Sequence, residues 1–475
     1  MNTKALRQKI LDLAIHGKLV PQDPNDEPAS VLLERIRAEK ERLIKEGKIK
    51  RPKKTKATSD KPHYPYELPE GWVWCKLSDC CHIAGRIGFR GYTKDDLVGF
   101  QKGAITLSPS NIIDGEMDYN KCTYISWDKY EESPEIEVLE GDILLVKTGS
   151  SFGKCALVDK LPWKSTINPQ FVILKYISIN EQYLTWVLQS SYARNNYNDF
   201  VLGTAIPTFT QVVLGNMPIP LPPISEQLKI VKKLKHLFLS INSLEDNKKS
   251  LCTLIKESKS KVLDLAIHGK LVPQNPADES ASELLKRINP KAEITCDNGH
   301  YQKLPEGWCA CKLSDICVFD SGYAFSSDNY KESGTPLIRI SNITNTGSID
   351  LSSCVFIQNT PGDKFIVRKG DLLIAMSGAT TGKMGVYFYE EDALLNQRVG
   401  NLKCTNAMFQ TYRNYYMFAK SDYILKIAYG GAQPNISSKA ILDIDVMLPP
   451  LKEQHRIVAK IEEIFARLDA IEASL

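Results

Sequence analysis

A twelve-residue segment occurs twice without change, and this repetition constrains the fold more than any other feature. The segment Leu11–Gln22 reads LDLAIHGKLVPQ, and it returns as Leu263–Gln274. Three further blocks follow in the same order in both copies: LPEGW at 68–72 and 304–308, Gly-Asp-(Ile/Leu)-Leu at 141–144 and 370–373, and LPP…EQ at 221–227 and 448–454. Because the order is kept, the chain is a tandem duplication of one large unit rather than a solenoid of short repeats.

The positions at which the copies are cut predict a circular arrangement. In the middle of the chain the LPP…EQ block runs directly into the LDLAI block, whereas at the ends of the chain the same two blocks are separated. Joining Leu475 to Met1 would recreate the central segment. We therefore predict a circularly arranged duplication with an approximate two-fold axis.

The segments that join the copies carry a helical pattern of apolar residues. The apolar positions alternate steps of four and three through Leu237, Ile241, Leu244, Leu251, Ile255, Val262 and Leu265, and again through Ile457, Ile461, Ile464, Leu468 and Ile471. Lys248 and Ser258 interrupt the central series. Such steps are typical of helices that pair along a seam. We expect a central helix of roughly 65 Å to pair with the terminal helices in antiparallel orientation. The alternative is that these are ordinary amphipathic helices, each packed on its own domain.

Between the helical segments lie two regions that read as mixed β structure. Gly-Asp turns open apolar runs at 141–147 and 370–376, which predicts buried strands there. The fold class is therefore α+β, with two β-rich domains separated by a helical spacer. We divide the chain into an N-terminal helical segment (1–58), a first β-rich domain (59–222), a central spacer (223–296), a second β-rich domain (297–449) and a C-terminal helix (450–475).

The composition is that of an ordinary globular protein, with 43% hydrophobic and 24% charged residues. No stretch approaches the roughly 18 apolar residues that a membrane helix needs. The N-terminus lacks the apolar core of a signal peptide, so we expect a cytoplasmic protein. The twelve cysteines form no C-x-x-C pair and no zinc-finger spacing. We therefore expect free thiols and no metal site.

Two glycine-rich turns invite comparison with a nucleotide-binding loop. The turns GSSFGK (149–154) and GATTGK (378–383) have one residue too few between their glycines, and Cys155 and Met384 stand where Ser or Thr is required. A tight polar turn near DNA phosphate is the interpretation that we favour. No methyltransferase, nuclease or hydrolase motif occurs elsewhere, so we predict no catalytic residue.

The ordered set of blocks resembles the DNA-specificity subunits of type I restriction–modification systems over essentially the whole chain. The resemblance rests on LDLAIHGKLVPQ, LPEGW, Gly-Asp-(Ile/Leu)-Leu…Gly-Lys and LPP…EQ. It implies two target-recognition domains, each of which reads one half of an asymmetric, interrupted site on double-stranded DNA. It also implies two modification (M) subunits, which bring S-adenosylmethionine, and restriction (R) subunits, which bring ATP and magnesium. The resemblance implies that neither a cofactor nor catalysis belongs to this chain.

The residues that we predict to contact DNA lie in polar loops that differ between the copies. In the first domain they are Arg86, Arg90, Lys94, Ser110, Asn111, Ser150, Ser151 and Lys154. In the second they are Arg339, Asn342, Thr380, Thr381, Lys383, Gln397, Arg398, Gln433 and Asn435. Arginine pairs with guanine, and Asn or Gln with adenine, through two hydrogen bonds. The alternative for each residue is a phosphate contact or a solvated loop.

Two other functions stay open from the residues alone. One is a purely structural coiled-coil scaffold. The other is a DNA methyltransferase or nuclease with an unrecognised motif.

Overall fold

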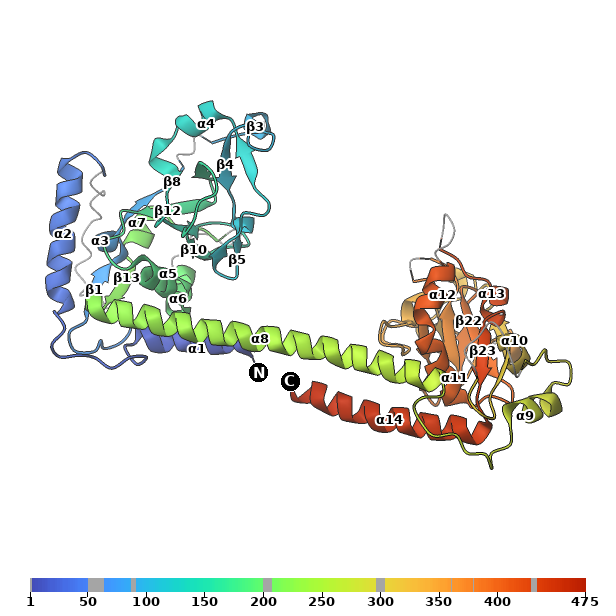
Figure 1. Cartoon of the computed structure of the whole chain (residues 1–475). Coiled ribbons are helices and arrows are strands. Elements are labelled where there is room, and N and C mark those ends of the chain that lie inside the picture. Colours follow the sequence, from blue (N-terminus) through green and yellow to red (C-terminus); the bar gives the residue numbers. More distant parts are fainter. Residues whose placement is uncertain are drawn as a thin grey trace. The chain divides into compact units, whose positions relative to one another are not determined.

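A single helix of 44 residues, α8 (Ile224–Ile267), belongs to both halves of the chain. The computed structural model describes residues 2–49, 64–86, 91–199, 207–295, 304–359, 361–378, 380–428 and 434–475. The chain forms two units, Met1–Asp246 and Asn247–Leu475, and the boundary falls in the middle of α8 (Figure 1). Each unit therefore holds one half of this helix.

The described part of the first unit contains two larger β-sheets, two separate strand pairs and helices from both ends of its sequence (Figure 1). Its helices are α1 (Thr3–Ile15), α2 (Ala29–Lys45), α3 (Leu77–Cys80), α4 (Trp127–Glu131), α5 (Glu181–Gln189), α6 (Ser191–Asp199) and α7 (Gln211–Gly215). Its strands are β1 (Val73–Lys76), β2 (His82–Ala84), β3 (Leu97–Val98), β4 (Ala104–Leu107), β5 (Ile112–Ile113), β6 (Glu116–Met117), β7 (Thr123–Ile125), β8 (Glu137–Val138), β9 (Ile143–Val146), β10 (Cys155–Leu157), β11 (Ser165–Ile167), β12 (Phe171–Lys175) and β13 (Pro218–Leu221).

The second unit has a similar inventory. Its helices are α9 (Ala281–Ile288), α10 (Leu313–Ile316), α11 (Gln410–Ala419), α12 (Ser421–Ala428), α13 (Ser438–Leu442) and α14 (Leu451–Ser474). Its strands are β14 (Cys309–Lys312), β15 (Cys317–Ser321), β16 (Thr335–Ile338), β17 (Val355–Ile357), β18 (Ile366–Val367), β19 (Leu372–Ala375), β20 (Met384–Val386), β21 (Ala393–Leu395), β22 (Val399–Cys404) and β23 (Asp445–Leu448).

The two units share one strand order. The sheet β10-β9-β12-β2 of the first unit matches β20-β19-β22-β15 of the second, and β7-β4-β11-β8 matches β17-β16-β21-β18. The first unit adds β3 at the edge of its second sheet. In both units one parallel pair, β4 with β11 or β16 with β21, occurs in an otherwise antiparallel sheet. The duplication read from the sequence is thus also a duplication of topology.

Strands β9 and β19, which are inner strands of the sheets β10-β9-β12-β2 and β20-β19-β22-β15, begin where the sequence predicts them. All four residues of β9 and all four of β19 are buried. Gly141 and Gly370 precede them with φ angles of +89° and +88°, a conformation that favours glycine. The next residue closes the turn, because Asp142 accepts a hydrogen bond from the Leu139 amide and Asp371 accepts one from the Arg368 amide.

Each half of α8 packs in antiparallel orientation against one other helix of its own unit. In the first unit Arg7 of α1 contacts Asn242 and Glu245, while Gln22, beyond the end of α1, reaches Glu226. In the second unit Lys259 contacts Asp469 of α14, and Lys248 reaches Leu475. The helical pattern read from the sequence therefore corresponds to real helix pairs within each unit.

Burial varies along the predicted seam, and its exposed positions lie in the middle of α8 and near the end of α14. Ile241, Ile255, Ile457 and Ile461 are buried, and Leu237, Val262, Leu265, Ile464 and Leu468 are partly buried. Leu244, Leu251 and Ile471 are exposed at 52%, 36% and 45%. The seam is therefore closed near each domain, while these three apolar side chains face solvent.

Candidate DNA interface

In the first unit, three of the repeated blocks meet at one buried carboxylate. Glu226, in the first turn of α8, accepts hydrogen bonds from the Trp72 indole (2.8 Å) and from the Gln22 side-chain amide (3.1 Å). These donors come from the LPEGW and LDLAI blocks. Only 1% of Glu226 is exposed, and this burial raises the pKa of its carboxyl group. These two hydrogen bonds therefore hold the start of the β-rich domain against the helices.

The second unit has the same arrangement at the corresponding residues. Glu453, near the start of α14, accepts hydrogen bonds from the Trp308 indole and the Gln274 amide, both at 3.1 Å. Burial raises the pKa of this carboxyl group as well. We call the two sets carboxylate junctions: Gln22–Trp72–Glu226 and Gln274–Trp308–Glu453.

Beyond each junction, turns from separate parts of the sequence meet along one edge of the β-rich domain. In the first unit the amide of Lys147 donates to the carbonyl of Gln170 (2.8 Å), and the amide of Phe209 donates to the carbonyl of Lys147 (3.3 Å). These bonds bring together the turns at 147–154 and 168–170 and the segment at 207–209. We call this set the first turn edge.

The second unit builds the corresponding edge with the same hydrogen-bond pattern. The amide of Met376 donates to the carbonyl of Arg398, and the amide of Ile436 donates to the carbonyl of Met376, both at 2.9 Å. The second turn edge thus consists of 376–378, 380–383, 396–398 and 434–436. The backbone is shared with the first edge, but the side chains are not.

Most of the predicted DNA contacts in these turns do lie together on the two edges. The first turn edge carries Ser150, Ser151 and Lys154, and the second carries Thr380, Thr381, Lys383, Gln397, Arg398 and Asn435. Ser150, Lys154, Gln397, Arg398 and Asn435 are exposed, whereas Ser151, Thr380 and Lys383 are partly buried. Thr381 is buried and donates to the carbonyls of Gly378 and Pro434, so its hydroxyl holds the turn together. Arg90 and Gln433 lie outside the described residues.

Two asparagines that we predicted to read bases serve instead inside the fold. Asn111 is 3% exposed, and its amide donates to the carbonyls of Asp118 and Lys121, both at 3.0 Å. Asn342 is 1% exposed, and its amide donates to the carbonyl of Asp350 at 2.9 Å. The side-chain oxygen of each also caps the preceding turn. A buried amide with such partners offers nothing to a base edge, because its hydrogen-bonding groups are already used.

The remaining predicted contacts belong to segments outside the two turn edges, and Arg86 and Arg339 adjoin these edges. Arg86 is buried; its guanidinium donates to the carbonyl of Ile167 and the hydroxyl of Thr166, and burial lowers its pKa. Arg339 donates to the carbonyl of Ser353 at 3.4 Å. Lys94 and Ser110 are exposed on short helical turns. The structure therefore gives Arg86 an internal role in the sheet.

One cation on the first turn edge, Lys147, was not among the DNA contacts predicted from the sequence. Lys147 is half-buried at the end of β9, and burial lowers the pKa of its ammonium group. No carboxylate in the described part of the chain pairs with it. In the second unit Met376 holds the matching position. The feature of the sequence that could have identified it is a lysine at the end of an apolar run, directly before the polar turn.

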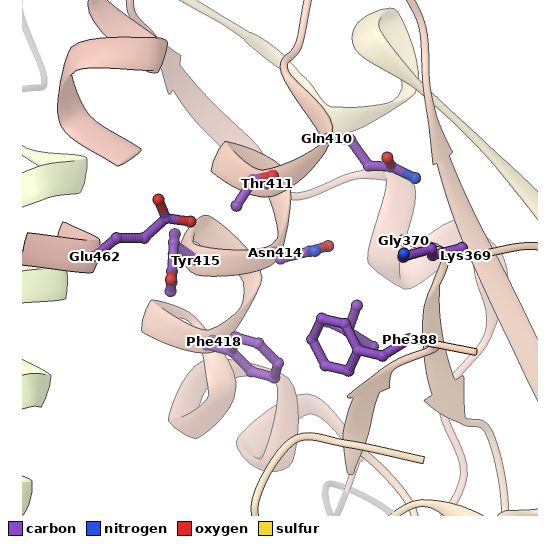
Figure 2. Close-up of a pocket in the computed structure, with 10 residues that line it drawn as sticks. Lys369, Gly370, Phe388, Gln410, Thr411, Asn414, Tyr415, Phe418 and Glu462 are labelled. Atoms are coloured by element: carbon purple, nitrogen blue, oxygen red, sulfur yellow. The ribbon is translucent and has the colours of Figure 1, made fainter. Parts of the chain in front are cut away.

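One cavity lies elsewhere in the second unit. It has a volume of about 490 Å³ and borders α11, α14 and the turn before β19 (Figure 2). Phe388, Phe418 and Tyr415 provide its aromatic walls. Because Gly370 lines it, the cavity is at the opposite end of β19 from the second turn edge, and we assign it no role in DNA contact.

Other kinds of site find no support in the described residues. Within them, no three His, Cys, Asp or Glu side chains are placed to hold a metal ion. The cysteines that the structure describes are free thiols. In the same residues, no helix combines the length and the apolar character that crossing a bilayer requires.

Two units of one topology, each with a carboxylate junction and a turn edge of its own chemistry, define a duplicated recognition protein. The chain belongs to the family of type I restriction modification DNA specificity domains, whose model matches residues 69–251 and 305–475. The prediction made from the sequence blocks is thereby confirmed. DNA-sequence recognition in a type I restriction–modification complex is the function of such a subunit, and catalysis and its cofactors belong to other subunits.

Relatives match over most of the chain. The specificity subunit of the type I restriction enzyme EcoAI from Escherichia coli is 30% identical, over 97% of this chain and 88% of its own. That of EcoKI from Escherichia coli strain K12 is 24% identical, over 86% and 84%. The crystal structure of the HsdS subunit from Thermoanaerobacter tengcongensis shares the fold, with a TM-score of 0.53, 19% identity and coverage of 86% and 93%.

Proposed function

We propose that the chain reads an asymmetric, two-part sequence on double-stranded DNA, with one turn edge for each half of the site. The observation that carries this proposal is the contrast between the edges. Their backbone hydrogen bonds correspond, at Lys147 and at Met376, but the first presents lysines and serines and the second presents Gln397, Arg398 and Asn435. A common scaffold with different polar side chains is what two different half-sites require.

We assign different tasks to the side chains of the edges. Lys147 and Lys154 contact phosphates, because an ammonium group is a point charge that positions a protein on DNA without reading its sequence. Arg398 contacts guanine, and Gln397 or Asn435 contacts adenine, because these side chains match the donors and acceptors of those bases in the major groove.

For the architecture, we propose a circularly arranged duplication with an approximate two-fold axis and an antiparallel helical spacer. The shared strand order and the antiparallel helix pair in each unit support it. The division into segments 1–58, 59–222, 223–296, 297–449 and 450–475 remains our proposal for the domains. In this arrangement the length of the spacer sets the distance between the half-sites, in steps of the roughly 10 base-pair helical repeat.

For the partners, we propose two M subunits that dock on the helical spacer and R subunits that join through the complex. The M subunits supply S-adenosylmethionine for adenine methylation, and the R subunits supply ATP-driven translocation and cleavage with magnesium. The exposed apolar residues Leu244, Leu251 and Ile471 support docking on the spacer, because apolar groups on a helix surface favour a partner. The complex works in the cytoplasm, where the host DNA is.

Methylated-base sequencing of host DNA tests the proposal, with the gene intact and with the gene deleted. We expect one two-part adenine-methylated motif to vanish on deletion and to return when the intact gene is supplied again. If methylation is unchanged by the deletion, either the gene is silent in these cells or the proposed function is wrong. DNA binding by the chain with purified M subunits then separates a silent gene from a wrong assignment.

A further inference from the structure

Two cysteines of the second unit face each other on neighbouring strands, away from the second turn edge. Cys317 begins β15, Cys404 ends β22, and the two are direct partners in the antiparallel register. The thiol of Cys317 points to the sulfur of Cys404, at an Sγ–Sγ distance of 4.0 Å. Cys317 is buried, whereas Cys404 is partly exposed. The residue with the greater exposure is therefore Cys404, and the thiol of Cys317 lies beside its sulfur.

The ladder around this pair has a geometry that a disulfide can occupy. The amide of Thr405 donates to the carbonyl of Ile316, so the next pair along the strands, Cys317 with Cys404, is not hydrogen-bonded through the backbone. Cα atoms of such pairs lie about 4.5 Å apart. Disulfides span Cα distances of about 4.4–6.8 Å. A bond between the two sulfurs thus needs side-chain rotation rather than a new strand register.

A buried positive charge lies beside the pair. Arg413 is 0% exposed, and its guanidinium donates to neutral groups: the carbonyls of Leu402 and Gly370 and the side chain of Asn414. No carboxylate in the described part of the chain forms an ion pair with Arg413. The hydrogen bond from Cys317, together with this guanidinium, lowers the pKa of the Cys404 thiol. The Cys317 thiol and the Arg413 guanidinium thus favour the ionised form of the Cys404 thiol, whereas burial and the Asp371 carboxylate oppose it.

The first unit contains a second thiol pair that lacks these features. Cys75 and Cys80 are closer, at an Sγ–Sγ distance of 3.3 Å, but both are buried. The strands that match β15 and β22 pair Lys175 with His82 and bring no two cysteines together. The chain therefore provides its own control, in which two thiols are near each other without exposure and without a buried guanidinium.

We propose that Cys404 and Cys317 form a peroxide-reactive dithiol, a site of reversible oxidative modification in the second unit. The Cys404 thiolate attacks one oxygen of a hydroperoxide, the O–O bond breaks, and Cys404 becomes a sulfenic acid while the other oxygen leaves as water or an alcohol. The Cys317 sulfur then attacks the Cys404 sulfur, and the sulfenic hydroxyl leaves as water. Two thiols and one peroxide thus give one disulfide, and a dithiol reductant reverses the change.

The test uses the full chain in its complex, treated with hydrogen peroxide, then alkylated and mapped as peptides without reduction. We expect a Cys317–Cys404 linked peptide to form while Cys75 and Cys80 remain alkylated as free thiols. Dithiothreitol should restore both cysteines of the second unit. In the C317S variant, Cys404 should instead be trapped by dimedone as the sulfenic acid, and in C404S neither product should form.

A rate measurement keeps the idea testable if a variant fails to fold. In the unmodified protein, iodoacetamide should alkylate Cys404 faster than Cys75 or Cys80 near neutral pH, by about 3- to 10-fold, because the pKa of Cys404 is lowered and the residue is less buried. Oxidation of Cys75–Cys80 at the same rate as Cys317–Cys404 would overturn the proposal. So would full recovery of Cys317 and Cys404 as free thiols after peroxide has oxidised the methionines.

Discussion

Trp72 and Glu226 are 154 positions apart in the sequence, yet the Trp72 indole donates a 2.8 Å hydrogen bond to the Glu226 carboxylate. The same relationship joins Trp308 to Glu453. Each bond ties the start of a β-rich domain to the first turn of a long helix. The duplicated sequence blocks are thus explained by a duplicated contact, in which each block supplies one partner.

Replacing Glu226 by Gln should destabilise the first unit by about 2 kcal/mol. The carboxylate accepts from both Trp72 and Gln22, whereas an amide has one oxygen and would turn its NH₂ group toward one of these donors. Thermal or denaturant unfolding measures the change. Glu453→Gln is the matched substitution and should have a similar effect; no loss in either variant would contradict the role of the junction.

The same variant predicts a pH dependence. Because burial raises the pKa of Glu226 in the folded state, the folded protein binds this proton more tightly than the unfolded chain does. The resulting stabilisation is fully present below the ordinary pKa of about 4.3 and is lost as pH rises through the raised value. The destabilisation by Glu226→Gln should therefore be larger near about pH 5 than near about pH 8. Equal differences at both pH values would show that the carboxyl titrates normally.

Replacing Asn111 by Ala should lower stability and leave the DNA target unchanged. The variant leaves the carbonyls of Asp118 and Lys121 and the amide of Ser108 without their hydrogen-bond partner, which should lower the free energy of unfolding by about 2–4 kcal/mol. Unfolding and methylated-base sequencing measure the two effects separately. A changed half-site in a variant of normal stability would restore Asn111 as a base reader.

Replacing Lys147 by Met should weaken binding of the complex to all DNA sequences alike. A lost phosphate contact reduces the slope of log affinity against log salt by about 0.9. Met is the residue of the matching position, Met376, so the substitution suits the scaffold. Lys160→Met, beyond the other end of β10, is the control and should leave the slope unchanged. If wild-type complex binds specifically but Lys147→Met keeps the full slope, the phosphate contact is wrong while the proposed function stands.

Replacing Arg398 by Ala should relax preference at one position of one half-site, by about 1–3 kcal/mol. Competition binding with every single-base variant of the site measures this preference. Arg368→Ala is the matched control, because Arg368 precedes the opposite end of β19. An equal loss of affinity for every sequence would make Arg398 a phosphate contact instead.

The sequence alone predicts the family, the duplication, the buried strands at 143–146 and 372–375 and the paired helices. These features depend on local patterns: apolar periodicity, Gly-Asp turns and repeated blocks. From the sequence, the turns at 149–154 and 378–383 are also interpreted as polar turns near DNA phosphate. The structure brings these turns to corresponding edges of the two units.

The tertiary structure decided which polar residues are free to meet DNA. Asn111 and Lys147 look equally available in the sequence, but folding buries Asn111 with its hydrogen bonds satisfied and leaves Lys147 half-buried with no anion beside it among the described residues. Likewise, nothing local joins Glu226 to Trp72 or Cys317 to Cys404. The physical reason is that a side chain's partners are set by strand register and helix packing between distant segments, which local pattern does not specify.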